Sequence, residues 1–218
     1  YATACRRQLV AAADGALSAW NQRGDGPIAR LDVRSAARLA EAFALSGDQA
    51  FADAACAILL QTAREYPGLK TTRAAGRLAA STLLEGPVAV DAAMAYDLLA
   101  GSGQFTAAQQ EMICNDLFRI MGRECGRGCH HLDSSNWRSW GLCIVACCGF
   151  ASGDMELIDE AINGFWDKAR GRHLYGFAQQ LTHSIFSDGI HWERSIGYTY
   201  YTSSALMYLM VAAENSGI

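Results

Sequence analysis

The sequence predicts an all-α protein in which helical hairpins build an incomplete (α/α) toroid. Apolar residues recur at helical spacing, and a hairpin signal repeats along the chain. Hydrophobic residues make up 51% of the chain and charged residues 18%, with only three prolines, which argues against disorder and favours helix. We find no convincing period-two alternation, so strands should be few or absent.

Three segments carry the helical pattern. From Phe51 to Leu59 the apolar positions follow the i, i+3, i+4, i+7 spacing of an amphipathic helix. A similar stripe from Leu157 to Trp166 predicts a second helix. Residues 140–150 are apolar all round, as expected for an inner helix of a toroid. Because a membrane span needs roughly 20 apolar residues, we expect this segment to be buried in the protein and expect no membrane association.

A hairpin signal links these helices. Residues 45–48 (Leu-Ser-Gly-Asp) and 151–154 (Ala-Ser-Gly-Asp) are each followed by Asp and Ala at the same offsets, and residues 102–104 form a weaker copy. Glycine tolerates the left-handed conformation that ends a helix, so each copy predicts a helical hairpin, repeating at roughly 50 residues. No linker interrupts the pattern, so we expect one domain over residues 1–218. The expected loops are residues 23–28, 67–71, 85–87, 123–134 and 187–195.

Charge excludes one class of partner. The net charge is −4 and no basic stripe is present, so we expect no nucleic-acid binding. An acidic polysaccharide is compatible with this charge, because a local group of Arg or His reverses the field inside a cleft.

The eight cysteines divide into two groups. Residues 125–131 include Cys125, Cys129, His130 and His131, which are metal-ligating types. Structural zinc sites pair two separated ligand pairs, so with one cluster we expect no metal and no cofactor. A Cys125–Cys129 disulfide, which would require export, and two free thiols both stay open. The other six should act as small hydrophobic residues of helices: Cys5, Cys56, Cys114, Cys143, Cys147 and Cys148.

Two polar and aromatic segments, residues 129–138 and 186–201, each lead into an apolar helix. Helix N-termini present free N–H groups and partial positive charge, which suit an anionic ligand. Loops held by a rigid frame are common places for function. We therefore expect the functional site at these two helix starts.

These segments resemble heparinase II/III-like polysaccharide lyases and their alginate-lyase relatives. The second segment has Asp188-Gly189 followed by Glu193-x-Ser-x-x-Tyr198, and the first has the Asn-containing helix start at Asn136. The resemblance is clearest over residues 136–213. It implies an incomplete toroid followed by a β-sandwich domain, so we expect this chain to be part of a longer, secreted or periplasmic protein whose C-terminal β-sandwich completes the cleft.

The resemblance also implies roles for individual residues. Asn136 holds the uronate carboxylate, and Tyr198 acts as the acid and often as the base. Several members have His directly after the Asn, where this chain has Trp137, so the histidine that assists is open; we take His191 as the catalytic candidate. The expected substrate-binding residues are His131, Arg138, Trp192, Glu193 and Arg194.

The chemistry fits these residue types. β-Elimination removes the C5 proton of a uronate and expels the oxygen on C4. Amide, His or Arg donors to the uronate carboxylate stabilise the enolate-like transition state, while a base and an acid move the protons. We therefore expect a polysaccharide lyase acting on an acidic uronate glycan of the glycosaminoglycan, alginate or ulvan type.

Other interpretations stay open. Tyr198 has helical spacing with Tyr201 and could only pack, Asn136 could be a helix N-cap, and Glu193 could hold a loop group. Asp188 and Glu193 could instead serve a glycoside hydrolase, which uses two carboxylic acids. A uronate epimerase and a non-catalytic glycan-binding toroid are further alternatives.

Overall fold

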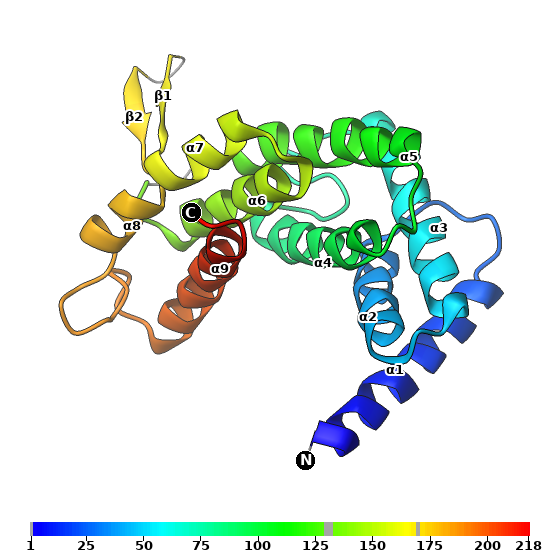
Figure 1. The fold of residues 1–218 in the computed structure, drawn as a ribbon. Coiled ribbons are helices and arrows are strands. Elements are labelled where there is room, and N and C mark those ends of the chain that lie inside the picture. Colours follow the sequence, from blue (N-terminus) through cyan, green and yellow to red (C-terminus); the bar gives the residue numbers. More distant parts are fainter. Residues whose placement is uncertain (1, 129–132, 169–170) are drawn as a thin grey trace. The chain divides into compact units, whose positions relative to one another are not determined.

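The computed structural model describes residues 2–128, 133–168 and 171–218, and it confirms the all-α prediction (Figure 1). The elements are α1 (Ala2–Gln22), α2 (Arg30–Ser46), α3 (Gln49–Glu65), η1 (Tyr66–Gly68), α4 (Thr82–Gly101), α5 (Ala107–Met112), η2 (Ile113–Arg119), η3 (Gly122–Gly126), α6 (Asn136–Ser152), α7 (Met155–Asn163), β1 (Phe165–Asp167), β2 (Arg172–Leu174), α8 (Phe177–His183) and α9 (Ile196–Asn215). Within the described residues, the single sheet pairs β1 with β2 in antiparallel register.

The chain divides into two compact units. Unit 1 comprises Tyr1–Leu69 and Asp91–Leu117, and unit 2 comprises Lys70–Val90 and Phe118–Ile218. Helix α4 supplies its first half to unit 2 and its second half to unit 1. Both segments predicted to carry the functional site belong to unit 2. One domain over residues 1–218, and its closure as a toroid, stay predictions.

The first hairpin signal forms as predicted in unit 1. Gly47 ends α2 with a φ of 75°, and its N–H donates to the carbonyl of Phe43 at 2.7 Å. Asp48 then starts α3 by accepting the N–H of Ala50 at 3.0 Å. Helix α2 packs against both α1 and α3.

The second copy repeats this geometry in unit 2. Gly153 ends α6 with a φ of 64°, and the Asp154 carboxylate accepts the first free N–H groups of α7, those of residues 156 and 157. Burial raises the pKa of Asp154, but the N–H of Leu157 and the guanidinium groups of Arg119, 3.1 Å away, and Arg123 outweigh it and hold the pKa below its ordinary value. The two hairpins thus use the same local chemistry, which confirms the repeat.

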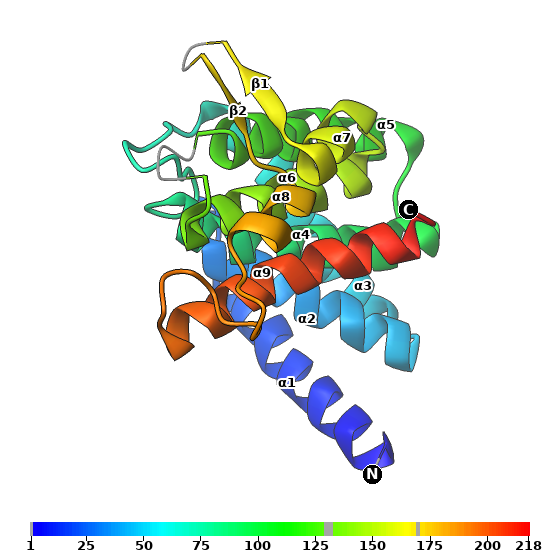
Figure 2. The ribbon, with the colours of Figure 1, turned by 90° about the vertical axis from the view of Figure 1, so that its left-hand side faces the viewer.

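Helix α6 is the core of unit 2. Residues 138–149 are all buried, and α6 packs against η3, α7 and α9 (Figures 1 and 2). The prediction of a buried helix over residues 140–150 is confirmed. None of the helices in the described part of the chain has the length and apolar character needed to span a membrane.

The predicted helix over Leu157–Trp166 is too long. Helix α7 ends at Asn163, and Phe165 and Trp166 belong to β1. Gly164 turns the chain with a φ of 76°, and a Cβ there would lie 2.1 Å from the carbonyl oxygen of Leu174. The close approach of two backbone segments therefore requires glycine and stops the helix, although the apolar stripe continues.

The predicted loop at residues 85–87 is wrong, because these residues lie inside α4. The buried Glu85 carboxylate accepts the N–H groups of Arg77 (3.1 Å) and Ala79 (2.7 Å) from the preceding loop. A Cβ on Gly86 would lie 2.2 Å from Cε3 of the buried Trp140, so glycine leaves room for this ring. Partners far away in the sequence make a Glu-Gly-Pro stretch helical.

Proline is tolerated here because another donor replaces its missing N–H. In a helix the N–H of residue 87 would bond the carbonyl of Leu83, but Pro87 has none. The hydroxyl of Tyr201 donates to that carbonyl instead, at 2.9 Å.

The other predicted loops are correct in part. The loop predicted over residues 123–134 is too long at its start, since η3 continues to Gly126. In the loop predicted over residues 67–71, residues 67 and 68 belong to η1. Residues 23–28 and 187–195 are loops as predicted.

Candidate functional site

Helix α6 begins where the loop of residues 184–195 reaches it. Ser135 is the N-cap, but its side chain makes no capping hydrogen bond. The carboxylate of Glu193 accepts the backbone N–H of Asn136 at 3.1 Å and its side-chain Nδ2 at 2.8 and 3.0 Å. A carboxylate is stabilised at the positive end of a helix. Asn136 is therefore not the N-cap, and Glu193 does hold another group of the protein.

Asn136 has a fixed amide orientation. Asn136 is 3% exposed, and a carboxylate can only accept hydrogen bonds, so the amide must turn Nδ2, its donor end, toward Glu193. The amide oxygen Oδ1 is buried without a hydrogen-bond partner among the described residues. Buried polar atoms are usually hydrogen-bonded, so an orphan acceptor marks a place that can receive a donor group.

His191 is fully buried between two acceptors. Its Nε2 lies 3.0 Å from the Ser134 carbonyl, which can only accept, so Nε2 carries a hydrogen. Its Nδ1 lies 3.2 Å from Oε2 of Glu193, outside hydrogen-bond geometry. Burial lowers the pKa of His191, while the Ser134 carbonyl and the Glu193 charge oppose that shift. Nδ1 is thus the proton-accepting atom of this group.

The loop is anchored by a shared acceptor. Nε1 of Trp192 donates at 2.6 Å to the same Ser134 carbonyl that faces His191. Arg194 adopts a φ of 52°, and its N–H closes a turn on the His191 carbonyl at 2.8 Å. Its guanidinium lies 5.7 Å from the ring centroid of Phe186. The structure thus holds the backbone between Trp192 and Ser195 tightly.

Tyr198 and Tyr201 differ in their surroundings. Tyr198 lies in the first turn of α9 and is 49% exposed, and its hydroxyl makes no hydrogen bond within the described residues. The hydroxyl of Tyr201 donates to the Leu83 carbonyl, and its ring centroid lies 4.9 Å from that of Trp140. Burial raises the pKa of Tyr201. Tyr201 therefore packs, whereas Tyr198 presents its phenol at the surface.

Residues 14–218 match the family model described as alginate lyase. The chain belongs to the alginate lyase family. It is a polysaccharide lyase, as the sequence predicts. The match extends over both units and includes both segments of the candidate site. No curated protein matches this chain.

Arg138, a predicted substrate-binding residue of this lyase, makes contacts within the protein itself. Arg138 is 2% exposed, and its Nε donates to the Tyr175 carbonyl at 2.8 Å while its guanidinium faces Phe165 at 5.7 Å. These contacts support the β1–β2 segment, and substrate binding by Arg138 stays a prediction. His131 lies outside the described residues, as do Cys129 and His130.

The sequence did not reveal two groups that build the site of this lyase. The backbone carbonyl of Ser134 receives both loop anchors, and no side-chain pattern marks a carbonyl for such a role. Gln180 is fully buried in α8, accepts from the hydroxyl of Ser139 at 3.3 Å and donates to the carbonyl of Asp133. Its neighbours in the sequence do not distinguish it from an exposed helical glutamine.

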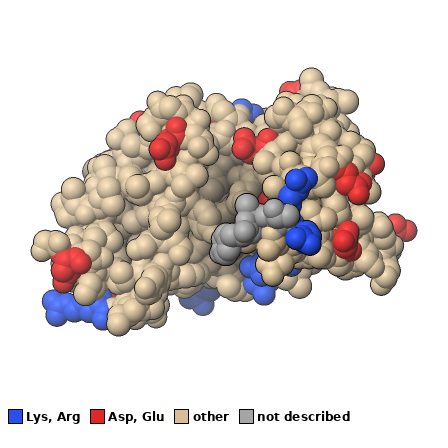
Figure 3. All heavy atoms as spheres, turned by 60° about the horizontal axis from the view of Figure 1, so that its bottom comes forward, with Lys and Arg blue, Asp and Glu red and all other residues tan. Residues whose placement is uncertain are grey.

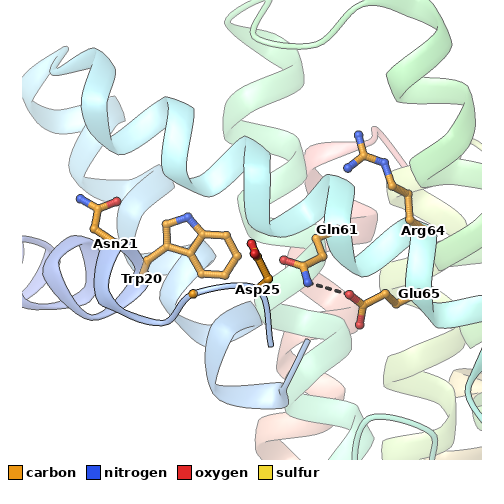
Figure 4. Close-up of a pocket in the computed structure, with 7 residues that line it drawn as sticks. Trp20, Asn21, Asp25, Gln61, Arg64 and Glu65 are labelled. Carbon is orange, nitrogen blue, oxygen red and sulfur yellow. Dashed lines mark hydrogen bonds between the residues drawn. The ribbon is translucent and has the colours of Figure 1, made fainter. Parts of the chain in front are cut away.

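A cavity of about 600 Å³ lies elsewhere in the lyase, in unit 1 (Figure 4). It is lined by Trp20, Asn21, Gly24, Asp25, Gln61, Arg64 and Glu65. Gln61 donates to Glu65 at 2.6 Å, and Glu65 accepts the N–H of Ile28 at 2.8 Å. These polar groups hold the loop between α1 and α2, and none of the predicted site residues lines the cavity.

On the face in Figure 3 the described Lys and Arg side chains lie in small separate groups rather than in one broad patch. Across residues 2–128, 133–168 and 171–218, no cluster of three His, Cys, Asp or Glu side chains is arranged to hold a metal ion.

Proposed function

We propose that this polysaccharide lyase cleaves an acidic uronate glycan by β-elimination, with Asn136 binding the uronate carboxylate and Tyr198 moving the protons. One observation carries the proposal. The loop that ends at α9 is bonded to the first residue of α6, so the amide of Asn136 and the exposed phenol of Tyr198 belong to one connected part of unit 2.

The residues divide the reaction between them. The Asn136 amide nitrogen Nδ2 carries two hydrogens; with one of them shared between the two oxygens of Glu193, the second is the group we assign to the uronate carboxylate. This donor, with the N-terminus of α6, stabilises negative charge that builds up as the C5 proton leaves. The phenolate form of Tyr198 takes that proton as the base and becomes the phenol. It then returns a proton to the C4 oxygen as the C4–O bond breaks and the C4–C5 double bond forms.

We assign His191 a supporting role in this site. Its imidazole is fully buried, whereas the Tyr198 phenol is exposed, so Tyr198 is our choice for direct proton transfer. Trp192 and Arg194 lie on the same loop and are proposed to contact the sugar ring and its charged groups. Glu193, expected from the sequence to bind substrate, instead bonds Asn136.

The proposed substrate class follows from the uronate carboxylate that the reaction requires. A polyuronate such as alginate is the first choice, and glycosaminoglycans or ulvan share the required group. The resemblance to heparinase II/III-like lyases supports a secreted or periplasmic enzyme in which a β-sandwich domain closes the cleft. Such closure would exclude water and orient the chain being cut.

The test is a screen of acidic polysaccharides, read by the ultraviolet absorbance of the unsaturated product. Alginate, heparan sulfate, chondroitin sulfate, hyaluronan and ulvan form the set, and a neutral glucan is the control. Absorbance that rises with one or more uronate polymers supports the proposal. New reducing ends without ultraviolet absorbance would identify a hydrolase. Altered uronate stereochemistry without cleavage would identify an epimerase. Binding without turnover would identify a glycan-binding protein.

A further inference from the structure

Glu193 lies at the point where the two site segments meet. Its carboxylate faces the backbone N–H and Nδ2 of Asn136 and Nδ1 of His191, all within 3.2 Å. We infer that Glu193 is a positioning residue that acts through Asn136, holding the amide in the one orientation that offers Nδ2 to the substrate. This inference rests on the proposed function, because it assigns Glu193 a task in that reaction.

The contacts fix which end of the Asn136 amide faces Glu193. The terminal torsion of an asparagine is broad and roughly two-fold, so an unrestrained amide would also present its oxygen. With Glu193 in place, a flipped amide would set Oδ1 against two carboxylate oxygens that now accept from Nδ2 at 2.8 and 3.0 Å. Acceptor atoms would then face each other. The flipped orientation is therefore excluded, and Nδ2 stays on the side of Glu193.

The carboxylate itself is held by its neighbours in the loop. On one side, Trp192 and His191 bond the Ser134 carbonyl, two residues before Asn136. On the other side, Arg194 adopts a left-handed φ of 52°. A non-glycine residue keeps such a conformation only where its surroundings determine it, and such residues gather at functional sites. The loop therefore delivers Glu193 to the start of α6 in a defined place.

Two features argue that Glu193 does not bind the substrate itself. Its carboxylate carries the same charge as a uronate, so direct contact between the two would be repulsive. Its two oxygens already accept three hydrogen bonds, all from Asn136. With one Nδ2 hydrogen shared between the two Glu193 oxygens, the other Nδ2 hydrogen is the group that suits a uronate. Glu193 thus contributes by fixing Asn136.

A double-mutant cycle tests this indirect role. Glu193→Gln puts an amide against the donors of Asn136, and we expect kcat/KM on a cleaved uronate polymer to fall about 10- to 100-fold, as loss of a supporting contact does. In the Asn136→Ala background, the same substitution should change kcat/KM by less than about threefold, because residues that act as one unit are not additive. Glu193→Asp, which keeps the charge, should recover part of the activity.

Asp159→Asn is the matched control. Asp159 also accepts from an asparagine side chain, Nδ2 of Asn163 at 2.8 Å, but this pair is exposed on α7. Its variant should keep wild-type kcat/KM. A second readout needs no activity: the Asn136 side-chain amide resonance, identified by its loss in Asn136→Ala, should shift and exchange faster with water in Glu193→Gln.

The outcomes separate the two claims. If wild-type protein forms no unsaturated product from any uronate polymer, the proposed function fails. The positioning role is wrong if the wild type is active and Glu193→Gln leaves kcat/KM unchanged. It is also wrong if the fold-loss in kcat/KM of the double mutant equals the product of the losses of Glu193→Gln and Asn136→Ala. An unchanged Asn136 amide resonance in a folded Glu193→Gln protein also overturns it.

Discussion

Replacing Tyr201 by phenylalanine should destabilise the protein without stopping catalysis. The substitution removes the hydroxyl that donates to the Leu83 carbonyl at 2.9 Å, and Pro87 cannot donate in its place. Such a hydrogen bond contributes about 1 kcal/mol, and an acceptor left without a donor costs up to about 3 kcal/mol. For a protein of this size, 1 kcal/mol shifts Tm by about 2–4 °C. We therefore expect a fall in Tm of about 2–12 °C, toward the lower end because the hydrogen bond is partly buried.

Pro87→Ala provides the decisive comparison. Alanine restores an N–H that can bond the Leu83 carbonyl within α4, so Tyr201→Phe should then lower Tm by less than half as much. Thermal unfolding followed by circular dichroism measures all four proteins. Equal losses in the two backgrounds would mean that this hydrogen bond is not what Tyr201 provides. Loss of activity in Tyr201→Phe would move the proton-transfer role from Tyr198 to Tyr201, because the ring still packs on Trp140.

Three further predictions concern the same unit. Gly86→Ala should lower Tm, because the new methyl group would lie 2.2 Å from the Trp140 ring. Overpacking costs about 1–3 kcal/mol, which exceeds the gain of up to about 1 kcal/mol from replacing a helical glycine. A rise in Tm would refute this. Burial lowers the pKa of His191. The unfolded chain therefore takes up the extra proton first as pH falls below about 6.5, so wild-type Tm should drop on acidification, and that of His191→Gln should drop less; parallel curves would contradict it. Trp192→Phe removes the bond to the Ser134 carbonyl and should speed hydrogen exchange in residues 186–195, whereas unchanged exchange would show that the anchor is unimportant.

The fold could be predicted where short-range chemistry determines it. Gly153 and Asp154 end one helix and start the next through contacts within a few residues, so the sequence predicts that hairpin. Gly164 stops α7 because its backbone lies against Leu174, and nothing beside Gly164 announces that contact. Residues 85–87 contain the usual signals of a loop, yet Trp140 and Tyr201 make them helical. Contacts between distant parts of the chain account for both errors.

The direct bond between two predicted site residues could not be predicted for the same reason. Asn136 and Glu193 are 57 positions apart, and their bond depends on the path of the intervening helices. Asparagine before an apolar run also suggests an N-cap, and only the structure assigns that place to Ser135. Gln180 is buried through tertiary contacts with Asp133 and Ser139 that its local sequence does not encode.

Tyr198→Phe tests the central claim most directly. The variant keeps the ring and removes only a hydroxyl that bonds no other described group, so folding and substrate affinity should stay close to wild type. With the uronate polymer that the wild-type protein cleaves, formation of the unsaturated product should slow by about 10²- to 10⁴-fold in kcat, with KM nearly unchanged. A variant that keeps more than roughly a tenth of wild-type kcat, well above what loss of an acid–base group leaves, would contradict the assignment of Tyr198.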